Sequence, residues 1–445
     1  MGYTHGSMAE VDATPQGPRV FWGWWIFTGA IITQFVTIGF AAQVTGVFLQ
    51  PMTEDLGWTR SEFVLAASLG FAIGGISGFI IGPLIDRYGA RPIMLFGGTL
   101  GGLALIGVSQ IDTLWQFIVV RGAFSQVGLF MVGPFVVNAT LSKWFVVNRG
   151  RVIALASIGP SLGGIIPPLA LTPIVDNYGW ETGWVVLGIA TLVLVYPCAI
   201  VMRREPEDYG LLPDGKTGYE EPTEEERRQM EMVRRDFMSS YTRGEAVRTS
   251  ALWLLAVGFA LGVAVVASLF AHFIPFMTDA GYTRQQAAFV FAGQGGVALV
   301  SKFWWAWIMQ RRSPRGLAVL SMAMMGISVA LLPMAADTSL IALLLVFSIA
   351  GFGVGGMFPL FDFVWAWYFG RRYIASVRST GLPISVVIAV TGPILTGLYH
   401  DVVGNYTGAF FALAVVIAVG ATLLLISRRP RPKELPEAPS MARVA

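Results

Sequence analysis

The sequence predicts an all-α membrane protein with twelve transmembrane helices, arranged as two six-helix bundles. Three observations predict this fold class. Hydrophobic residues make up 55% of the 445 residues and charged residues only 13%, whereas soluble globular proteins carry about 25% charged residues. Apolar runs long enough to cross a bilayer recur along the whole chain. A pattern of residues in the first half also returns in the second half at a fixed offset.

The apolar runs define twelve expected helices, because about 20 residues rising roughly 1.5 Å each cross the apolar core of a bilayer. Six of them precede a polar segment and six follow it. The first six are expected at 22–49, 62–83, 93–111, 115–138, 150–174 and 183–202. The second six are expected at 251–276, 286–309, 316–335, 339–366, 375–398 and 405–427.

An internal repeat relates the two halves. The segment 51–60 (PMTEDLGWTR) matches the segment 275–284 (PFMTDAGYTR) at an offset of 224 residues, and the same offset aligns 82–91 with 306–315. An even number of helices in each half gives both copies the same orientation. Parallel repeats of this kind are expected to face each other across a site near the membrane midplane and to rock about it.

The polar segment between the halves sets the expected domain boundaries. These are an N-terminal tail at 1–20, an N-terminal bundle at 21–202, a linker at 203–250, a C-terminal bundle at 251–427 and a C-terminal tail at 428–445. The linker is rich in both acidic and basic residues, so we expect it to be largely solvated. Thr223 precedes three glutamates and is expected to cap a helix there.

Basic residues predict the orientation of the chain in the membrane. They gather in the loops on one side, and the opposite loops carry only Arg60 and Arg284. Because basic loops stay in the cytoplasm, both termini and the linker are expected there. Arg121 and Lys302 lie inside the predicted spans. The basic residues on the expected cytoplasmic side include Arg87, Arg91, Lys143, Arg149, Arg151, Arg311, Arg312, Arg315, Arg371 and Arg372.

A glycine and charge motif lies in the predicted loop between the second and third helices. Its members are Gly82, Asp86, Arg87, Gly89 and Arg91. The glycines permit close backbone approach and a turn. The Asp86 carboxylate suits a helix N-terminus or a nearby arginine. This motif resembles the signature of the major facilitator superfamily, and the resemblance implies that it is a gating loop that latches the bundles on the cytoplasmic side in the outward-facing state.

The second copy of this motif departs from the pattern. Gln310 stands in place of the acid and Ser313 in place of the second glycine. A neutral amide cannot make the charge-assisted contacts of a carboxylate. The latch in the second half is therefore expected to be weak or absent.

Five further stretches resemble the monocarboxylate-transporter-like branch of that superfamily, including bacterial oxalate/formate-antiporter relatives. The resemblance covers nearly the whole chain except the termini and the middle of the linker. It implies a secondary transporter for a small organic anion. The stretches are FWGWW at 21–25, Trp144-Phe145 with Arg149-Gly150, ASIGPSLGG at 156–164, REPEDYGLLPDG at 204–215 and HFIPFMTDAG at 272–281.

Lys302 is a cation within the apolar run 286–309. Such a charge costs on the order of 2.5–3.5 kcal/mol near the centre of a membrane helix. Either its long side chain reaches the cytoplasmic surface, or it lies in a solvated cavity that binds an anion. The resemblance implies the second role, since the branch commonly has a carboxylate-binding arginine here. A lysine keeps the charge but loses the bidentate geometry.

Three other ionisable residues in the spans are candidates. His272 lies near the outer end of its helix, where imidazole either binds a carboxylate, passes a proton or packs as a hydrogen-bonded side chain. Asp362 is expected at the depth of Lys302, so it either forms an Asp362–Lys302 pair that balances charge or couples a proton, or lies near water at a helix end. Arg121 is expected either in proton coupling or in a structural tie to Asp112 or Asp176.

Uncharged polar residues complete the predicted substrate site, although each also suits an ordinary hydrogen bond between helices. No Walker sequence, zinc spacing or catalytic triad motif is present, so neither an enzyme activity nor a cofactor nor a metal site is expected. The uncharged candidates for substrate binding are Gln34, Asn138, Gln294 and Ser385.

The predicted function is transport of a small organic anion, most simply a monocarboxylate, by alternating access with proton symport. Two alternatives stay open, namely anion exchange and a transporter-like sensor that signals through the linker. The expected partners are the anion, a proton and the lipid bilayer, with no nucleic acid, and the expected state is a monomer. The expected location is the plasma membrane or the bacterial inner membrane, which the chain crosses many times.

Overall fold

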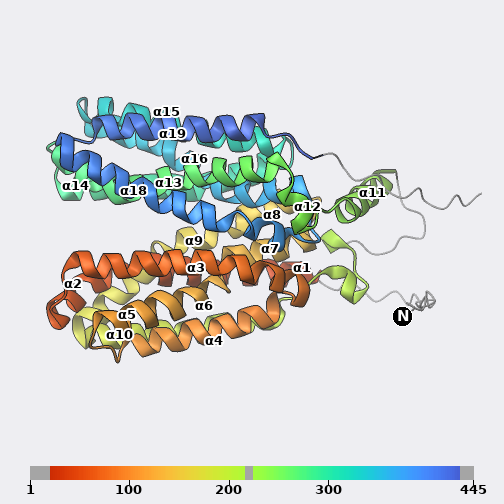
Figure 1. The fold of residues 1–445 in the computed structure, drawn as a ribbon, viewed down its shortest axis with the longest axis horizontal. Helices are drawn as coiled ribbons and strands as arrows, with labels where there is room; N and C mark the ends of the chain where they lie inside the picture. Colours follow the sequence, from red (N-terminus) through yellow and green to blue (C-terminus); the bar gives the residue numbers. More distant parts are fainter. Residues whose placement is uncertain (1–20, 216–223, 431–445) are drawn as a thin grey trace, which may run out of the picture.

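The computed structural model describes residues 21–215 and 224–430. All regular structure in these two ranges is helical, and Figure 1 shows that the helices form two groups lying side by side. The group coloured red to yellow-green belongs to the first half of the sequence, and the green to blue group belongs to the second half. The segment between the halves lies at one end of both groups, which we call the linker side.

The first half contains helices that are interrupted by two π-helical segments, η1 and η2. Its elements are α1 (Trp22–Ile38), η1 (Gly39–Gln43), α2 (Thr45–Leu56), α3 (Arg60–Tyr88), α4 (Ala90–Val108), α5 (Leu114–Phe117), η2 (Ile118–Ser125), α6 (Gln126–Phe130), α7 (Pro134–Trp144), α8 (Arg149–Ala156), α9 (Ile158–Gly163) and α10 (Ile166–Val201).

The linker and the second half are more regular. The linker elements are η3 (Pro206–Tyr209), η4 (Pro213–Gly215), α11 (Glu224–Met238) and α12 (Arg243–Val247). The second half contains α13 (Ser250–Asp279), α14 (Arg284–Ile308), α15 (Pro314–Ala336), α16 (Leu340–Phe369), α17 (Ile374–Ser379), α18 (Leu382–Val403) and α19 (Thr407–Ile426).

The predicted number of membrane crossings is confirmed. Eleven stretches of the described chain are helical and apolar enough to cross a membrane, and one of them, Arg149–Val201, is 53 residues long. A helix of that length would extend roughly 80 Å, far more than the bilayer core of about 30 Å. Gly179 breaks this stretch with φ 86° and ψ 161°. The stretch therefore crosses twice, and the chain has the twelve spans that the sequence predicts.

Several helices continue beyond the predicted ends, because polar residues at the membrane surface remain helical. The prediction that the gating motif lies in a loop is wrong, because most of its residues are helical. Gly82, Asp86 and Arg87 belong to α3, and Arg91 belongs to α4, so that only Gly89 lies between the two helices. Gly89 has φ 81°, a conformation that glycine adopts without strain. Lys143 is likewise in α7 rather than in a loop.

The internal repeat extends to the helix caps. Thr59 and Glu62 form a capping box at the start of α3, and Thr283 and Gln286 form another at the start of α14. A capping box satisfies backbone N–H groups that have no partner within the helix. The two boxes lie 224 residues apart, which is the offset that the sequence repeat predicts.

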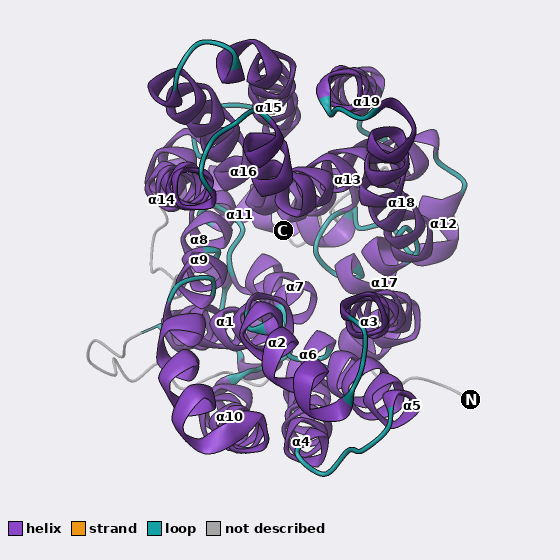
Figure 2. Ribbon diagram, turned by 90° about the vertical axis from the view of Figure 1, so that its left-hand side faces the viewer, coloured by secondary structure: helices purple, strands orange, loops and turns teal. Residues whose placement is uncertain are grey.

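The two bundles meet through a small set of helices. α3 contacts α17 and α18, α8 and α9 contact α14, and α7 contacts α16 and α17. Figure 2, which views the molecule from the side opposite the linker, shows α4, α5 and α10 at the outer edge of the first bundle. The interface helices therefore position the candidate site, whereas the outer helices form the periphery.

Most described residues of α11 and α12 are exposed, as expected of a largely solvated linker, but the linker also packs against the bundles. Arg243 of α12 lies 3.8 Å from the ring centroid of Phe79 in α3 and donates from Nε to Thr380 Oγ1 at 3.1 Å. It thus contacts both bundles. The expected helix cap Thr223 lies outside the described residues, and α11 is described from Glu224 onward.

Candidate functional site

Lys302 lies between the two bundles rather than toward lipid or the surface. Its side chain is 6% exposed. The ammonium donates to the carbonyl oxygen of Ser157 and to Ser161 Oγ, the latter at 2.6 Å. Both partners belong to the other bundle, where the helix is interrupted between α8 and α9 at Ser157 (φ −69°, ψ −1°). The cation therefore contacts neutral oxygens across the interface.

A second set of polar contacts crosses the interface and consists of four side chains in series. Gln34 Nε2 of α1 donates to Asn138 Oδ1 of α7 at 3.2 Å, and Asn138 Nδ2 donates to Asp362 Oδ2 of α16 at 2.6 Å. Asp362 also forms an ion pair with Arg378 of α17. Asp362 and Arg378 are 7% and 10% exposed. This chain of contacts joins α1 and α7 of the first bundle to α16 and α17 of the second.

The expected pair between Asp362 and Lys302 is wrong. Asp362 instead pairs with Arg378, which lies at the start of the next transmembrane segment and was not recognised from the sequence as a charge inside the predicted span 375–398. Burying a carboxylate is costly unless a cation and hydrogen bonds accompany it. Arg378 and Asn138 supply both, which leaves Lys302 without a carboxylate among the residues that the structure describes.

Asp86 forms the predicted contact at a helix N-terminus. Its Oδ2 accepts from the backbone N–H of Ser376 in α17 at 2.7 Å, across the bundle interface. Its Oδ1 lies 2.9 Å from Nζ of Lys143 in its own bundle, and Lys143 is only 2% exposed. Gly82 allows this approach, since a Cβ there would lie 2.6 Å from the carbonyl oxygen of Ala375.

The second copy of the latch is a weaker contact of the same kind. Gln310, at the position equivalent to Asp86, donates from Nε2 to Asn148 Oδ1 at 3.0 Å in an exposed setting. Asn148 precedes α8 of the first bundle. A neutral, exposed hydrogen bond contributes less than a buried charge-assisted one. Of the other motif residues, Arg87 and Arg91 are exposed, and the Arg87 guanidinium lies 5.2 Å from the ring centroid of Tyr88.

The linker adds a charged contact on the same side. Asp236 of α11 accepts two hydrogen bonds from Arg149, with Nη1–Oδ1 and Nη2–Oδ2 distances of 3.2 and 2.8 Å. Arg371, from the second bundle, lies 3.7 Å from Asp236 through its Nε. Arg371 also pairs with Glu207 and donates to the carbonyl oxygen of Lys143 at 2.8 Å. We call Asp236, Arg149, Arg371 and Glu207 the linker clamp, since they join the linker to both bundles.

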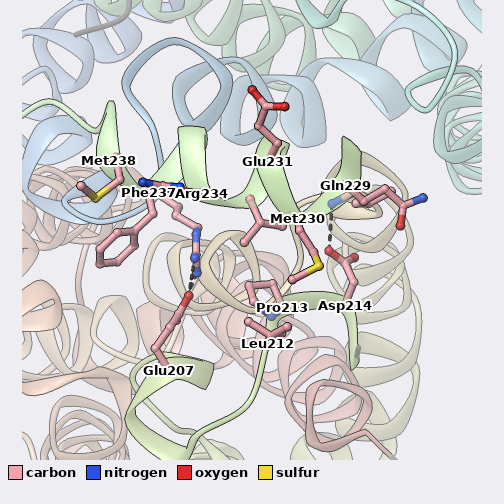
Figure 3. A pocket seen from close by; sticks show the side chains of 13 residues that line it. Glu207, Leu212, Pro213, Asp214, Gln229, Met230, Glu231, Arg234, Phe237 and Met238 are labelled. Carbon is pink, nitrogen blue, oxygen red and sulfur yellow. Dashed lines mark hydrogen bonds and ion pairs between the residues drawn. The ribbon is translucent and has the colours of Figure 1, made fainter. Parts of the chain in front are cut away.

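A pocket of about 480 Å³ lies beside the linker clamp. Figure 3 shows Met230 and Phe237 of α11 on one side of it and Leu212 and Pro213 on the other. Asp214 fixes the position of the linker segment that lines the pocket, because its carboxylate accepts hydrogen bonds from the backbone N–H groups of Val146 and Val147, both at 2.9 Å. The pocket thus lies between two linker segments, and Val147 of the first bundle and Arg371 of the second also line it.

The remaining predicted residues lie within single bundles. His272 Nε2 is 2.9 Å from the carbonyl oxygen of Pro393, and its Nδ1 is 3.4 Å from Tyr406 Oη. Ser385 donates weakly to the carbonyl oxygen of Ala256 at 3.4 Å, and Gln294 packs against Gly351. These contacts hold helices of the second bundle together, and a substrate role for the three stays a prediction.

The expected tie from Arg121 to Asp112 or Asp176 is wrong. Arg121 lies in the π-helical η2 and is 3% exposed. It donates to the backbone carbonyl of Ala41 in η1 and lies 5.3 Å from the ring centroid of Trp184. π-Helical turns leave carbonyl groups without regular helical partners. Arg121 satisfies one of these carbonyls inside the first bundle, away from the bundle interface.

Sequence reasoning missed Arg378, the burial of Lys143 and the role of Asp236. A signal for Arg378 was present, because an arginine inside a predicted span calls for an acidic partner. The repeat offset also places Asn138 opposite Asp362. Nothing local in the sequence of α11 distinguishes Asp236 from its many charged neighbours.

Comparisons with known proteins agree with this architecture. The family model described as Major Facilitator Superfamily matches residues 30–382. Human monocarboxylate transporter 2 is 24% identical over 433 residues, which cover 93% of this chain and 87% of that protein. The MFS-type transporter pynF of Aspergillus niger is 30% identical over 190 residues, which cover 41% of this chain and 43% of that protein. In that match the chain spans less than half the length of the fungal relative.

Two solved structures share the fold. The proton:xylose symporter XylE superposes with a TM-score of 0.71 at 11% identity, covering 92% of this chain and 96% of that one. The human organic anion transporter MFSD10 superposes with a TM-score of 0.66 at 14% identity, covering 92% of this chain and 100% of that one. At such low identity the likeness establishes the arrangement of helices and not the transported molecule.

Proposed function

We propose a function on the premise that this chain belongs to the major facilitator superfamily and resembles its monocarboxylate-transporter-like members. Members of this family are multi-pass membrane transporters and not enzymes. Within that class, we propose that the chain carries a small organic anion, most simply a monocarboxylate, by alternating access. Human monocarboxylate transporter 2, which matches most of the chain, supports this substrate class.

One observation carries the proposal, namely the unpaired charge of Lys302. Its ammonium is buried between the bundles, and its contacts are Ser157 O and Ser161 Oγ. A buried cation with only neutral oxygen partners leaves much of its lost hydration uncompensated. A carboxylate supplies the missing negative charge. The two serine oxygens occupy the positions around the ammonium that substrate oxygens would take.

The location of those serine oxygens suggests how binding and movement are connected. Lys302 belongs to α14 of the second bundle, whereas Ser157 and Ser161 belong to the first. A carboxylate that displaces them removes two contacts that hold the bundles together. A ligand shifts a conformational equilibrium only through a difference in its affinity for the two states. This exchange of partners supplies such a difference.

The structure fits the outward-facing state in this scheme. The contacts of Asp86 with Ser376, of Gln310 with Asn148 and of the linker clamp all join the bundles on the linker side. We take that side to face the cytoplasm, which the gathering of basic residues there supports. Opening to the cytoplasm requires these contacts to break. Asp362 and Arg378 both belong to the second bundle, so their ion pair does not have to break for the bundles to move and persists until Asp362 takes up a proton.

Counterflow in proteoliposomes tests the proposal. Vesicles loaded with an unlabelled monocarboxylate should transiently accumulate the same compound in labelled form, and empty vesicles should not. A membrane sensor gives no counterflow. Absence of counterflow across a panel of short-chain carboxylates, with the protein shown to be folded, would overturn transport of a small organic anion.

A pH gradient separates proton symport from exchange. For symport, an acidic exterior should drive uptake into vesicles that contain no anion. For exchange, uptake should require an anion inside and should not respond to the gradient alone. We propose symport, with Asp362 as the protonated group, because its carboxylate is buried at the bundle interface inside a transmembrane helix, whereas Asp86 lies at the linker-side end of α3.

A further inference from the structure

We propose that a basic pocket on the linker side binds the phosphate of an anionic phospholipid. The pocket lies where α3 meets α4 and where α10 leads into the linker, and its volume is about 400 Å³. This inference depends on the membrane placement of the chain and not on the identity of the transported molecule. The residues of the pocket that carry the argument are Arg87, Arg91, Arg203, Arg204, Asp208 and Tyr209.

The four arginines give the pocket an excess of positive charge. Within residues 21–215 and 224–430, neither Arg87 nor Arg91 nor Arg203 forms an ion pair. Arg204 pairs with Asp208, at an Nε–Oδ2 distance of 2.8 Å, and this hydrogen bond raises the pKa of Arg204. Arg204 also pairs with Glu205 at 2.9 Å, so two carboxylates oppose the four arginines and an excess of positive charge remains around the cavity.

The pocket is built by close backbone packing and by aromatic rings. Gly89 has φ 81°, and a Cβ there would lie 2.9 Å from Cβ of Arg204, so the turn between α3 and α4 rests directly on the start of the linker. The Arg203 guanidinium lies 3.8 Å from the ring centroid of Trp22 and 4.3 Å from that of Tyr209. Such stacking fixes the plane of the guanidinium while its N–H groups remain free to donate.

The pocket opens beside the surface that faces lipid. Figure 2 shows α4 and α10 at the outer edge of the first bundle, away from the second bundle. Near the pocket, α4 exposes Phe96 by 61% and α10 exposes Ile200 by 53%. Tyr88, at the end of α3, is 55% exposed. Exposed apolar side chains below an aromatic and basic rim match the acyl chains and the headgroup region of a bilayer leaflet.

The basic pocket adjoins an exposed apolar surface, and this arrangement favours a lipid over a soluble anion. A soluble phosphate would use only the arginines, whereas a phospholipid also covers the apolar faces of α4 and α10. Basic pockets of this type on the cytoplasmic side bind lipid headgroups, and the cytoplasmic leaflet is rich in anionic lipid. Arg87 directly follows Asp86, so a bound headgroup also restrains the end of α3 from which Asp86 contacts Ser376.

Native mass spectrometry of the purified full-length chain tests the proposal. The protein is mixed with equal amounts of dioleoyl phosphatidylglycerol and dioleoyl phosphatidylcholine, and bound lipids are counted. We expect one phosphatidylglycerol adduct to persist preferentially. The double variant Arg87→Gln/Arg91→Gln should weaken it by roughly ten- to thirtyfold, given the usual contribution of a basic residue near an anionic membrane surface. The variant Arg87→Lys/Arg91→Lys should retain most of the binding.

The second half of the chain offers a matched control. Arg311 occupies the position equivalent to Arg87, and Arg311 and Arg312 are both exposed on the same side of the molecule. The variant Arg311→Gln/Arg312→Gln removes the same charge and should keep the adduct. Equal loss in both double variants would reduce the effect to general electrostatics and overturn the site. Displacement of the lipid by millimolar glycerol 3-phosphate would identify a soluble anion site instead, which also contradicts the proposal.

Discussion

Asn138 and Asp362 occupy equivalent positions in the two halves of the chain and are hydrogen bonded to each other across the bundle interface. They are separated by 224 residues, the offset of the internal repeat, and the Nδ2–Oδ2 distance is 2.6 Å. The pseudo-symmetry of the fold therefore brings one position of the repeat against its own copy. One copy carries an amide and the other a carboxylate, so the pair has a hydrogen bond and a single negative charge.

Arg378 pairs with one member of this pair and lies against a side chain from the helix that carries the other. It forms an ion pair with Asp362, and its guanidinium lies 5.2 Å from the ring centroid of Phe135 and 4.6 Å from that of Phe361. Phe135 precedes Asn138 by nearly one helical turn, and Phe361 directly precedes Asp362. One cation therefore contacts both helices that carry the two symmetric positions, α7 through Phe135 and α16 through Asp362.

We predict that the carboxylate can be moved from position 362 to position 138 without losing its pairing with Arg378. Asp362→Asn leaves Arg378 buried without a counter-ion and should lower stability by about 3–5 kcal/mol, as is typical when one partner of a buried ion pair is removed. The exchange variant Asn138→Asp/Asp362→Asn restores the charge near Arg378 and should recover much of the loss. Denaturation of the purified variants measures both values. An exchange variant no more stable than Asp362→Asn would contradict the shared use of Arg378.

Lys302→Ala should abolish uptake of the anion and leave the protein folded. A charge-assisted hydrogen bond contributes about 1.5–3 kcal/mol, so binding should weaken by roughly ten- to a hundredfold. Lys302→Arg keeps the charge and should retain measurable uptake. Ser161→Ala, which removes the hydroxyl that accepts from Lys302, should change affinity less than Lys302→Ala does. Full uptake by Lys302→Ala in the proteoliposome assay would remove this residue from the substrate site.

Asp236→Asn should favour opening of the linker side. The substitution weakens the contacts of α11 with Arg149 and Arg371, which belong to different bundles. Spin labels placed on the linker-side ends of α3 and α17 should report a larger population of long distances. Glu231→Gln is the control on the same helix, since Glu231 is 61% exposed and pairs only with Arg235 among the described residues. An equal effect of both substitutions would show that the clamp does not restrain the bundles.

The two copies of the latch should differ in strength. Asp86→Asn removes a buried charge that contacts Lys143 and the backbone of Ser376, whereas Gln310→Ala removes one exposed hydrogen bond. In a Cys198→Ser background, maleimide labelling of Ala375→Cys should accelerate with Asp86→Asn and change little with Gln310→Ala. A faster reaction with Gln310→Ala than with Asp86→Asn would contradict the asymmetry of the two latches.

Close helix packing at Gly82 should be required for the linker-side contact. A Cβ at Gly82 would lie 2.6 Å from the carbonyl oxygen of Ala375, so Gly82→Val should separate α3 from α17 and shift the protein away from the present state. Gly46→Val is the matched control, because a Cβ at Gly46 meets no atom within 4 Å. Both variants can be compared by the same distance measurement and by thermal unfolding. A similar outcome for both would show that packing at Gly82 is not limiting.

Several features of the fold follow from local patterns in the sequence. Long apolar runs must become helices in a bilayer, since each backbone polar group needs a partner within the segment. The runs therefore predict the twelve spans, and the repeat at an offset of 224 residues predicts two equivalent bundles. The ends of the helices were predicted less well, because hydropathy falls at Asp86, Arg87 and Lys143 although the backbone remains helical there.

The pairing of the charged side chains depends on three-dimensional information, namely the direction of each side chain and the approach of the helices. Depth along a helix suggested Lys302 as the partner of Asp362, but depth does not specify the direction in which a side chain points around the helix axis. That direction, together with the approach of α17 to α16, gives Asp362 the partner Arg378. The same approach of the two bundles gives Lys302 its oxygen partners on α8 and α9.

The sequence by itself determined the membrane class of this protein, its count of crossings, its repeat and the presence of a cation in an apolar span, because each is a property of residues close together in the chain or of a simple periodicity. Only the tertiary structure decided which charges neutralise one another and which one, Lys302, has no counter-ion among the described residues. Those pairings arise between helices that are distant in the sequence, and the cost of burying a charge depends on the atoms that surround it in three dimensions.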